Sequence, residues 1–275
     1  MMQEKTLLIN NKQISYSVSE NASGNLTVVL LHGFLETRQI WKNIIPKLDY
    51  PATIIAVDLP GHGKSDLLSY PQTIEEAAKA VQKVLEREKI NKAFIIGHSM
   101  GGYVGLEFLR HFPGTCAGLV LFFSTALPDS EEKKQNRLRA IEALRANRLN
   151  FILQSIPNLF APENRLHYSD RINKLIKQAE HIPAQNIEAC LLGMKDRRGS
   201  TDLLKQEHYP PVFYIIGRKD PVIDFDSYFN QIKLPAVKGV RIIENCGHMG
   251  FAEAEEDCAE AVNGFLHSIH NPVKH

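Results

Sequence analysis

A serine held between glycines is the feature of this sequence most able to carry out chemistry. Ser99 stands at the centre of the segment GHSMG, after an apolar run over 93–96 and before a helical pattern over 100–111. A sharp strand–serine–helix turn of this kind is a nucleophile elbow, in which glycines two residues away on either side avoid a collision across the turn. The pattern therefore predicts Ser99 as a nucleophile, with Gly97 and Gly101 as the elbow glycines.

Two later residues can supply the base and the acid that a serine nucleophile needs. A serine hydroxyl attacks only when a base takes its proton, and a carboxylate must orient that base. Asp220 follows a predicted strand over 212–216, and His248 follows another over 240–244. The order serine, acid, histidine is the order found where such an elbow is used. We therefore predict Ser99, Asp220 and His248 as a catalytic triad.

The chain also contains competing histidines and carboxylates close to these motifs. They are His32, His62, His98, Asp58, Asp224 and Asp226. We expect the first two histidines to make structural hydrogen bonds in their turns, and the third to point away from the serine. An acid placed after the earlier strand, over 118–123, would fall at Ser124, which cannot do this work. That position favours Asp220.

Acyl chemistry also needs two N–H groups that stabilise the oxyanion formed on attack. The residue after the nucleophile, Met100, is expected to provide one of them. The second is expected from Phe34, in the His-Gly-Phe segment that follows a predicted strand over 27–31. The predicted oxyanion hole is therefore made of the backbone N–H groups of Phe34 and Met100.

These residues lie on an alternation of short apolar runs and helical patterns, which indicates a doubly wound, mostly parallel α/β sheet. The predicted strands are 6–9, 13–18, 27–31, 53–57, 93–96, 118–123, 212–216 and 240–244. Helical patterns are predicted at 41–48, 74–85, 100–111, 131–148, 171–180, 187–194 and 258–269. No convincing strand lies between 123 and 212, so we predict a core over 1–126 and 208–275. A helical cap over 127–207 is then inserted after the sixth core strand.

The predicted cap is where substrate selectivity is expected. Phe151, Phe160 and Tyr168 are candidates for lining the pocket. The cap carries 14 Lys and Arg residues against 11 Asp and Glu residues. This excess is compatible with an anionic substrate, although mixed charges are typical of a solvated helix face.

Composition excludes several other classes of function. The chain has 275 residues, a formal net charge of +1 and a pI near 7.7, whereas nucleic-acid-binding domains usually have a pI above about 9. Its four cysteines form no metal-binding pattern, and Cys246 alone lies close to a predicted catalytic residue. No secretory signal or membrane-spanning segment is evident, so we expect a cytoplasmic protein that acts on a small molecule. No cofactor or metal is implied, and the oligomeric state stays open.

Taken together, these motifs resemble the α/β-hydrolase superfamily over nearly the whole chain. The segments that carry the resemblance are GHSMGG at 97–102, DLPGHGKS at 58–65, His-Gly-Phe at 32–34, the turn at 217–220 and Gly-His at 247–248. The pattern is similar to the esterases, C–C hydrolases and perhydrolases that have a helical cap. Haloalkane dehalogenases and epoxide hydrolases use an aspartate where this chain has Ser99. The menaquinone-pathway lyases commonly have an arginine where it has Tyr103.

The leading hypothesis is a serine hydrolase that cleaves a small carboxylic ester, or a related acyl or C–C bond, through an acyl-enzyme. A lyase or a cofactor-free perhydrolase with the same triad is a second hypothesis, and it predicts poor turnover of simple esters. A ligand-binding receptor on a retained hydrolase pocket is a third. It predicts tight ligand binding that survives the loss of Ser99.

Overall fold

An eight-stranded sheet forms the centre of the protein in a computed structural model, which describes residues 2–19 and 26–270. The strands are β1 (Met2–Ile9), β2 (Lys12–Ser19), β3 (Leu26–Leu31), β4 (Ala52–Val57), β5 (Ala93–His98), β6 (Cys116–Phe122), β7 (Val212–Gly217) and β8 (Val237–Ile243). Their order in the sheet is β1-β2-β4-β3-β5-β6-β7-β8, and all neighbours from β4 onward are parallel. The predicted mostly parallel α/β sheet is confirmed.

The residues of the central strands explain why these segments lie inside the molecule. Every residue of β3, β5 and β7 is buried. A continuous apolar run of this length is typical of a parallel strand covered by helices on both faces. The antiparallel hairpin of β1 and β2 turns at Asn10 and Asn11, whose φ angles of 49° and 64° suit asparagine in a tight hairpin turn.

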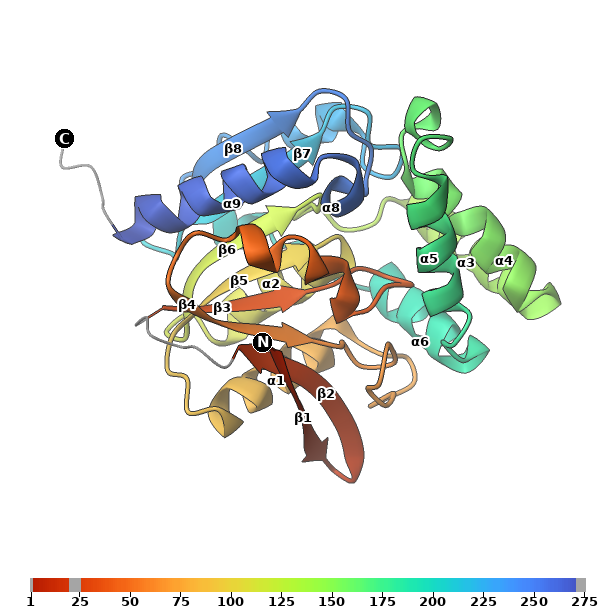
Figure 1. The fold of residues 1–275 in the computed structure, drawn as a ribbon, viewed down its shortest axis with the longest axis horizontal. Helices are drawn as coiled ribbons and strands as arrows, with labels where there is room; N and C mark the ends of the chain where they lie inside the picture. Colours follow the sequence, from red (N-terminus) through yellow and green to blue (C-terminus); the bar gives the residue numbers. More distant parts are fainter. Residues whose placement is uncertain (1, 20–25, 271–275) are drawn as a thin grey trace.

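Helices cover both faces of the sheet (Figure 1). On one face lie α1 (Ile74–Arg87) and α2 (Met100–His111), and on the other lies α9 (Glu255–His270). The helix predicted over 74–85 is confirmed as α1, and Thr73 caps it by accepting a hydrogen bond from the N–H of Glu76 at 3.2 Å. A Ser/Thr cap of this kind satisfies an N–H that the helix itself leaves free.

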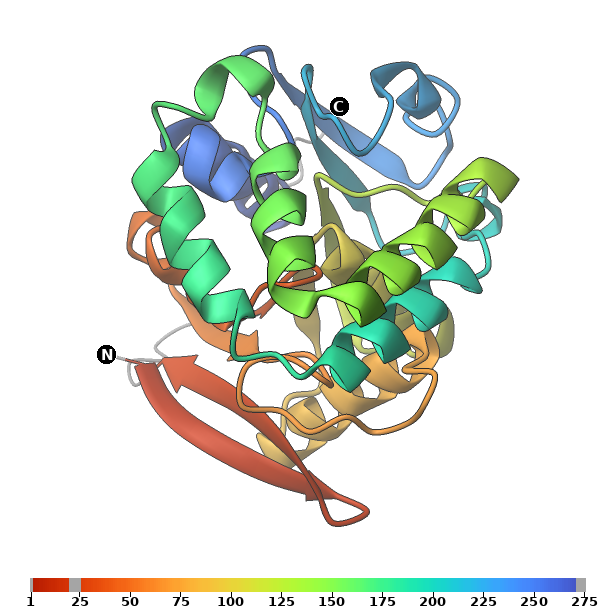
Figure 2. The same cartoon turned by 90° about the vertical axis from the view of Figure 1, so that its right-hand side faces the viewer.

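Four helices between β6 and β7 gather beyond the carboxyl ends of the parallel strands (Figure 1), and Figure 2 shows them face on. They are α3 (Glu131–Ala146), α4 (Arg148–Ser155), α5 (Ser169–Ala179) and α6 (Ala184–Lys195), with the 3-10 turns η3 (Pro157–Leu159) and η4 (Pro162–Asn164). We refer to this layer as the cap. It lies where the loops that follow the core strands open. The short α7 (Thr201–Leu204) leads back to the sheet, where Leu204 accepts from the N–H of Ala236, just before β8.

Two predicted helices are interrupted in the structure. The 41–48 stripe forms two short 3-10 turns, η1 (Arg38–Lys42) and η2 (Ile45–Lys47), because Pro46 has no N–H to continue an α-helix. The single helix predicted over 131–148 ends at Asn147, which has an extended backbone with φ −159°. Its side chain then caps the next helix by accepting from Asn150 N at 2.9 Å.

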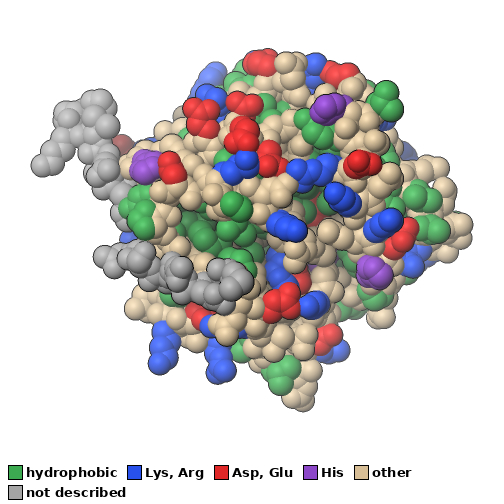
Figure 3. All heavy atoms as spheres, viewed as in Figure 1, with side chains coloured by type: hydrophobic (Ala, Val, Ile, Leu, Met, Phe, Trp, Pro, Cys, Tyr) green, Lys and Arg blue, Asp and Glu red, His purple; other side chains and the backbone are tan. Residues whose placement is uncertain are grey.

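Charged side chains of both signs are mixed on the surface. On the face shown in Figure 3, lysine and arginine side chains alternate with aspartate and glutamate side chains, in keeping with a net charge of +1. Within residues 2–19 and 26–270, no helix is long and apolar enough to cross a membrane.

Candidate active site

Ser99 occupies the turn between β5 and α2 in a strained backbone conformation. Its φ of 50° and ψ of −113° are rarely adopted by residues with side chains. The turn is so tight that a Cβ at Gly97 would lie 2.2 Å from the Gly101 carbonyl oxygen, and one at Gly101 would lie 2.4 Å from that of Leu31. Ser124, after β6, braces the turn by donating to the Ser99 carbonyl at 2.8 Å. The geometry is that of the elbow predicted from the sequence.

The structure brings the three residues of the predicted triad together. Ser99 Oγ lies 2.8 Å from His248 Nε2, and His248 Nδ1 lies 2.7 Å from Asp220 Oδ2. The side chains of His248 and Asp220 are almost completely buried, at 2% and 0% exposure. These contacts join loops that follow β5, β7 and β8, which lie at the same edge of the sheet. The series can pass a proton from the serine to the imidazole and stabilise the resulting imidazolium.

Asp220 is held in place by the loop that carries it. Its Oδ1 accepts hydrogen bonds from the N–H groups of Val222 at 2.7 Å and Ile223 at 3.0 Å, so that only Oδ2 faces the histidine. Asp224 instead caps the short turn η5 (Phe225–Tyr228) by accepting from Asp226 N at 3.4 Å. The structure therefore gives Asp220, and neither of the two later aspartates, as the carboxylate next to His248.

Two of the competing histidines, His32 and His62, make structural hydrogen bonds, as expected. His32 Nε2 accepts from Leu59 N at 2.9 Å, and His62 Nε2 accepts from Leu35 N at 3.3 Å. Burial lowers the pKa of His32 to about 4 and that of His62 to about 3. Both rings are therefore neutral near pH 7. They join the loop after β3 to the loop after β4.

His98 lies beneath the triad rather than in it. Its Nδ1 is 2.9 Å from Glu36 Oε2, and its Nε2 is 2.9 Å from the carbonyl oxygen of His248. Because both neighbours are acceptors, both ring nitrogens must carry protons to satisfy them. Burial opposes the charged form, but the Glu36 carboxylate and the His248 carbonyl outweigh it and raise the pKa of His98. A buried ion pair therefore supports the backbone of His248.

Glu36 also binds a backbone N–H group next to the predicted oxyanion hole. Its carboxylate accepts from the N–H of Gly33 at 2.6 Å, so this N–H is occupied. Among the described residues, the N–H of Phe34 has no backbone acceptor. Met100 begins α2, where the first N–H groups have no partner within the helix. Among the described residues, both N–H groups predicted from the sequence thus lack a backbone acceptor.

A buried carboxylate missed by sequence reasoning, Glu253, joins the cap to the histidine loop. It lies in α8 (Gly250–Glu253) and accepts from the backbone N–H groups of Gly247 and Met249, both at 3.2 Å. It also accepts from Ala161 N at 3.1 Å and from Asn164 Nδ2 at 2.7 Å, both in the cap. The only sign of this role in the sequence is that Glu253 lies shortly after His248.

The cap makes a second contact with the histidine loop through its backbone. The N–H of His248 donates to the carbonyl oxygen of Leu159 at 2.9 Å. The backbone N–H of His248 is thus hydrogen-bonded to the cap, and its carbonyl oxygen to the His98 ring. Residues far apart in the sequence therefore determine the position of His248.

A cavity of about 340 Å³ opens between Ser99 and the cap. Of the three aromatic residues predicted to line it, the structure brings only Phe151 to its wall. Phe160 is fully buried and packs 6.3 Å from the ring of Tyr168, whose hydroxyl donates to the carbonyl of Glu253 at 2.9 Å. For these two residues the prediction is wrong, because they face the core and α8 instead. A larger cavity of about 560 Å³ lies between η1 and α5 and includes none of the triad residues.

Cys246, close to His248 in the sequence, is a buried thiol. Burial raises its pKa well above the usual value, so it is not a reactive thiolate near pH 7. Its position is explained by packing.

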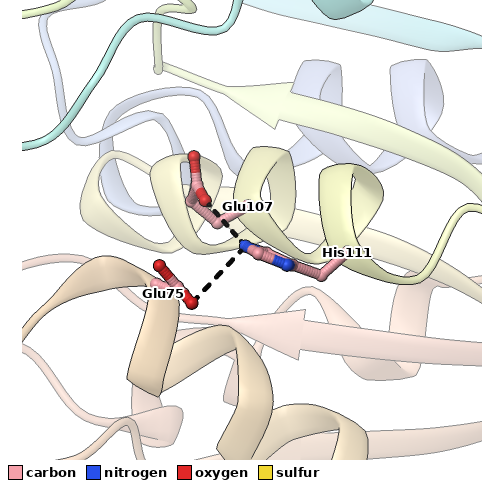
Figure 4. Close-up of side chains that lie close together, drawn as sticks. All are labelled: Glu75, Glu107 and His111. Carbon is pink, nitrogen blue, oxygen red and sulfur yellow. Dashed lines mark ion pairs between the residues drawn. The ribbon is translucent and has the colours of Figure 1, made fainter.

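Three other side chains, Glu75, Glu107 and His111, lie close enough to share a metal ion (Figure 4). However, Arg198 donates to both oxygens of Glu107, at 3.0 and 2.9 Å, and Lys79 lies 2.6 Å from Glu75. These cations already compensate the carboxylates. The cluster is an ion-pair network on α1 and α2, remote from Ser99.

Comparison with known proteins agrees with this architecture. The model described as "Alpha/beta hydrolase family" matches residues 28–261. Monoacylglycerol lipase ABHD6 of Homo sapiens is 24% identical over 282 residues, which cover 98% of this chain and 84% of that protein. A thermophilic esterase from Thermogutta terrifontis has a TM-score of 0.86 at 28% identity, covering 98% of this chain and 99% of that chain. An enol-lactonase from Burkholderia xenovorans LB400 shares the fold, with a TM-score of 0.84 at 19% identity over 96% of this chain and 100% of that one. The chain belongs to the alpha/beta hydrolase family.

Proposed function

We propose that this chain is a serine hydrolase that cleaves a small carboxylic ester, or a related acyl or C–C bond, through an acyl-enzyme on Ser99. The observation that carries the proposal is the hydrogen-bonded series from Ser99 Oγ through His248 to Asp220, which opens onto the 340 Å³ cavity. The esterase and lipase relatives support hydrolysis as the reaction class.

In the proposed reaction, His248 Nε2 accepts the Ser99 proton as Oγ attacks the carbonyl carbon of the ester. Asp220 stabilises the imidazolium, and the N–H groups of Phe34 and Met100 donate to the oxyanion. The tetrahedral intermediate then expels the alcohol, which takes the proton from His248. Water attacks the acyl group in the same way, giving the carboxylic acid and restoring Ser99. No cofactor takes part in these steps.

The test uses Ser99→Ala, with Ser155→Ala as a matched control, since Ser155 lines the same cavity. Wild type and Ser155→Ala are expected to hydrolyse short-chain esters and to be labelled by a fluorophosphonate probe. Ser99→Ala should lose labelling and several orders of magnitude in kcat, because a triad acts as a unit. Circular dichroism should show the same fold in all three proteins. Labelling of Ser99→Ala, or ester hydrolysis at the wild-type rate, would assign the nucleophile elsewhere.

A further inference from the structure

One wall of the cavity above Ser99 carries several charged side chains. Asp129, Lys133, Asn136 and Arg137, which lie on or just before α3, line this wall. The rest of the lining is largely apolar and includes Phe151, Leu159, Leu191, Met194 and Val222. A substrate in this cavity therefore meets both apolar surface and polar groups.

The only carboxylate on the α3 wall, within the described residues that line the cavity, is already compensated. Asp129 is bound by the guanidinium groups of Arg137 and Arg197, the latter at 2.6 Å, and its side chain is 0% exposed. Burial alone would raise the pKa of Asp129, but the two arginines outweigh it and lower that pKa. Two guanidinium groups on one carboxylate leave one positive charge in excess.

The other carboxylate among the described residues that line the cavity is Glu36, which is paired with the protonated His98. Asp220 does not line the cavity and is hydrogen-bonded to His248. Glu36 therefore does not neutralise the excess positive charge on the α3 wall.

Two donors on this wall have no adequate acceptor. Among the described residues, the ammonium group of Lys133 has no hydrogen-bond or ion-pair partner. The Nη1 group of Arg137 faces the thioether sulfur of Met194 at 3.6 Å, and thioethers are weak acceptors. Both donors belong to residues that line the cavity containing Ser99. An oxygen anion would satisfy them better than the protein does.

We infer that the site takes an ester that also carries a carboxylate a few bonds from the scissile carbonyl, bound by Lys133 and Arg137. This inference rests on the proposed function, because it places the scissile carbonyl at Ser99. A carboxylate suits this pair, since a guanidinium and an ammonium both form charge-assisted hydrogen bonds with it. The apolar part of the lining would contact the carbon chain that links the two groups.

The experiment compares pairs of esters that differ only in a terminal methyl or carboxylate. Methyl pentanoate and methyl hydrogen glutarate place the charge in the acyl part, and butyl acetate and 4-acetoxybutanoate place it in the alcohol part. Hydrolysis is followed in a pH-stat. We expect wild type to prefer the charged member of one pair by about tenfold in kcat/KM, the scale of one charge-assisted contact. The preference should fall as salt is added, because salt screens exposed charges.

Lys133→Met is expected to abolish that preference by raising KM for the charged ester much more than KM for its neutral counterpart. Lys134→Met is the matched control, because Lys134 is the next residue of α3 and pairs with Glu131 at 2.7 Å outside the cavity. Equal rates on the charged and neutral esters in wild type, or equal effects of the two substitutions, would overturn the inference. Neither result would affect the proposed triad, which the neutral esters and the fluorophosphonate probe test independently.

Discussion

The edge of the sheet and the cap contribute to the site in different ways. Ser99, Asp220 and His248 each lie within five residues of the end of a strand, and parallel pairing brings those ends together. In the cap, Phe151 lines the cavity while Phe160 is buried away from it. Strand ends thus position the chemical groups through the backbone. In the cap, by contrast, the rotation and packing of each helix decide which side chains reach the substrate.

The two regions are not independent, because hydrogen bonds cross between them at His248. Leu159 of the cap accepts from the His248 N–H, and Glu253 binds N–H groups of both the cap and the histidine loop. We therefore expect substitutions to fall into three groups: those that stop the chemistry, those that misplace the histidine and those that alter selectivity.

The largest effect is expected at the strand-end carboxylate. Asp220→Asn should lower kcat by about 10⁴-fold, since an aspartate in this position holds the imidazole tautomer and stabilises the imidazolium. Asp224→Asn, a few residues away in a turn cap, should stay close to wild type. Steady-state hydrolysis of a short-chain ester by both variants checks the difference. An active Asp220→Asn beside an inactive Asp224→Asn would mean that the acid of the triad is misassigned.

A smaller effect is expected where the two regions meet. Glu253→Gln replaces one acceptor oxygen with a donor that faces N–H groups, so the histidine loop should shift and kcat should fall by about 10²-fold. KM should change little, because Glu253 does not line the cavity. Asn164→Ala removes only the side-chain contact from the cap and should have a weaker effect. If both variants lower kcat equally, or if Glu253→Gln acts on KM alone, Glu253 does not position His248.

Within the cap, two phenylalanines provide a direct contrast. Phe151→Ala should change the ratio of kcat/KM between long and short acyl esters by about tenfold, the scale of a lost pocket contact. Phe160→Ala should leave that ratio unchanged while destabilising the protein by about 3–5 kcal/mol, as expected for a fully buried ring. Ester kinetics and urea unfolding of both variants separate the two outcomes. A selectivity change in Phe160→Ala alone would reverse their assignment.

The smallest effect concerns the ion pair beneath the triad. The stability that comes from the raised pKa of His98 is present below its usual value of 6.5 and is lost as pH rises through the folded-state pKa. The pKa of Glu36 is lowered despite burial, chiefly by His98, so its contribution is present above 4.5 and is lost as pH falls. The stability difference between wild type and Glu36→Gln should therefore be greatest between pH 4.5 and 6.5.

Urea unfolding across pH 4 to 9 measures this difference, with Glu142→Gln as the control for an exposed glutamate. The control should follow wild type at every pH. A difference between wild type and Glu36→Gln that does not change with pH would show that His98 keeps the same protonation state throughout this range.

The strands, and the loops that carry the residues of the proposed triad, could be predicted because both depend on local patterns. Apolar runs predicted the strands before Ser99 and Asp220, and a shorter apolar pattern over 240–244 predicted the strand before His248. The GHSMG segment needs its glycines for a steric reason that the structure shows as 2.2 and 2.4 Å approaches. The ends of helices were harder to predict from the sequence. Asn147 interrupts a pattern that continues on both sides of it, and its capping hydrogen bond to Asn150 is visible only in three dimensions.

By itself, the sequence determined the α/β sheet, the order of the triad residues along the chain and the turn that presents Ser99, because each of these follows from neighbouring residues. Only the tertiary structure decided that Glu36 pairs with His98, that Glu253 joins the cap to the histidine loop and that Lys133 faces the cavity. The physical reason is that these contacts join elements far apart in the chain. Their partners depend on how helices rotate and pack, and no local pattern records that rotation.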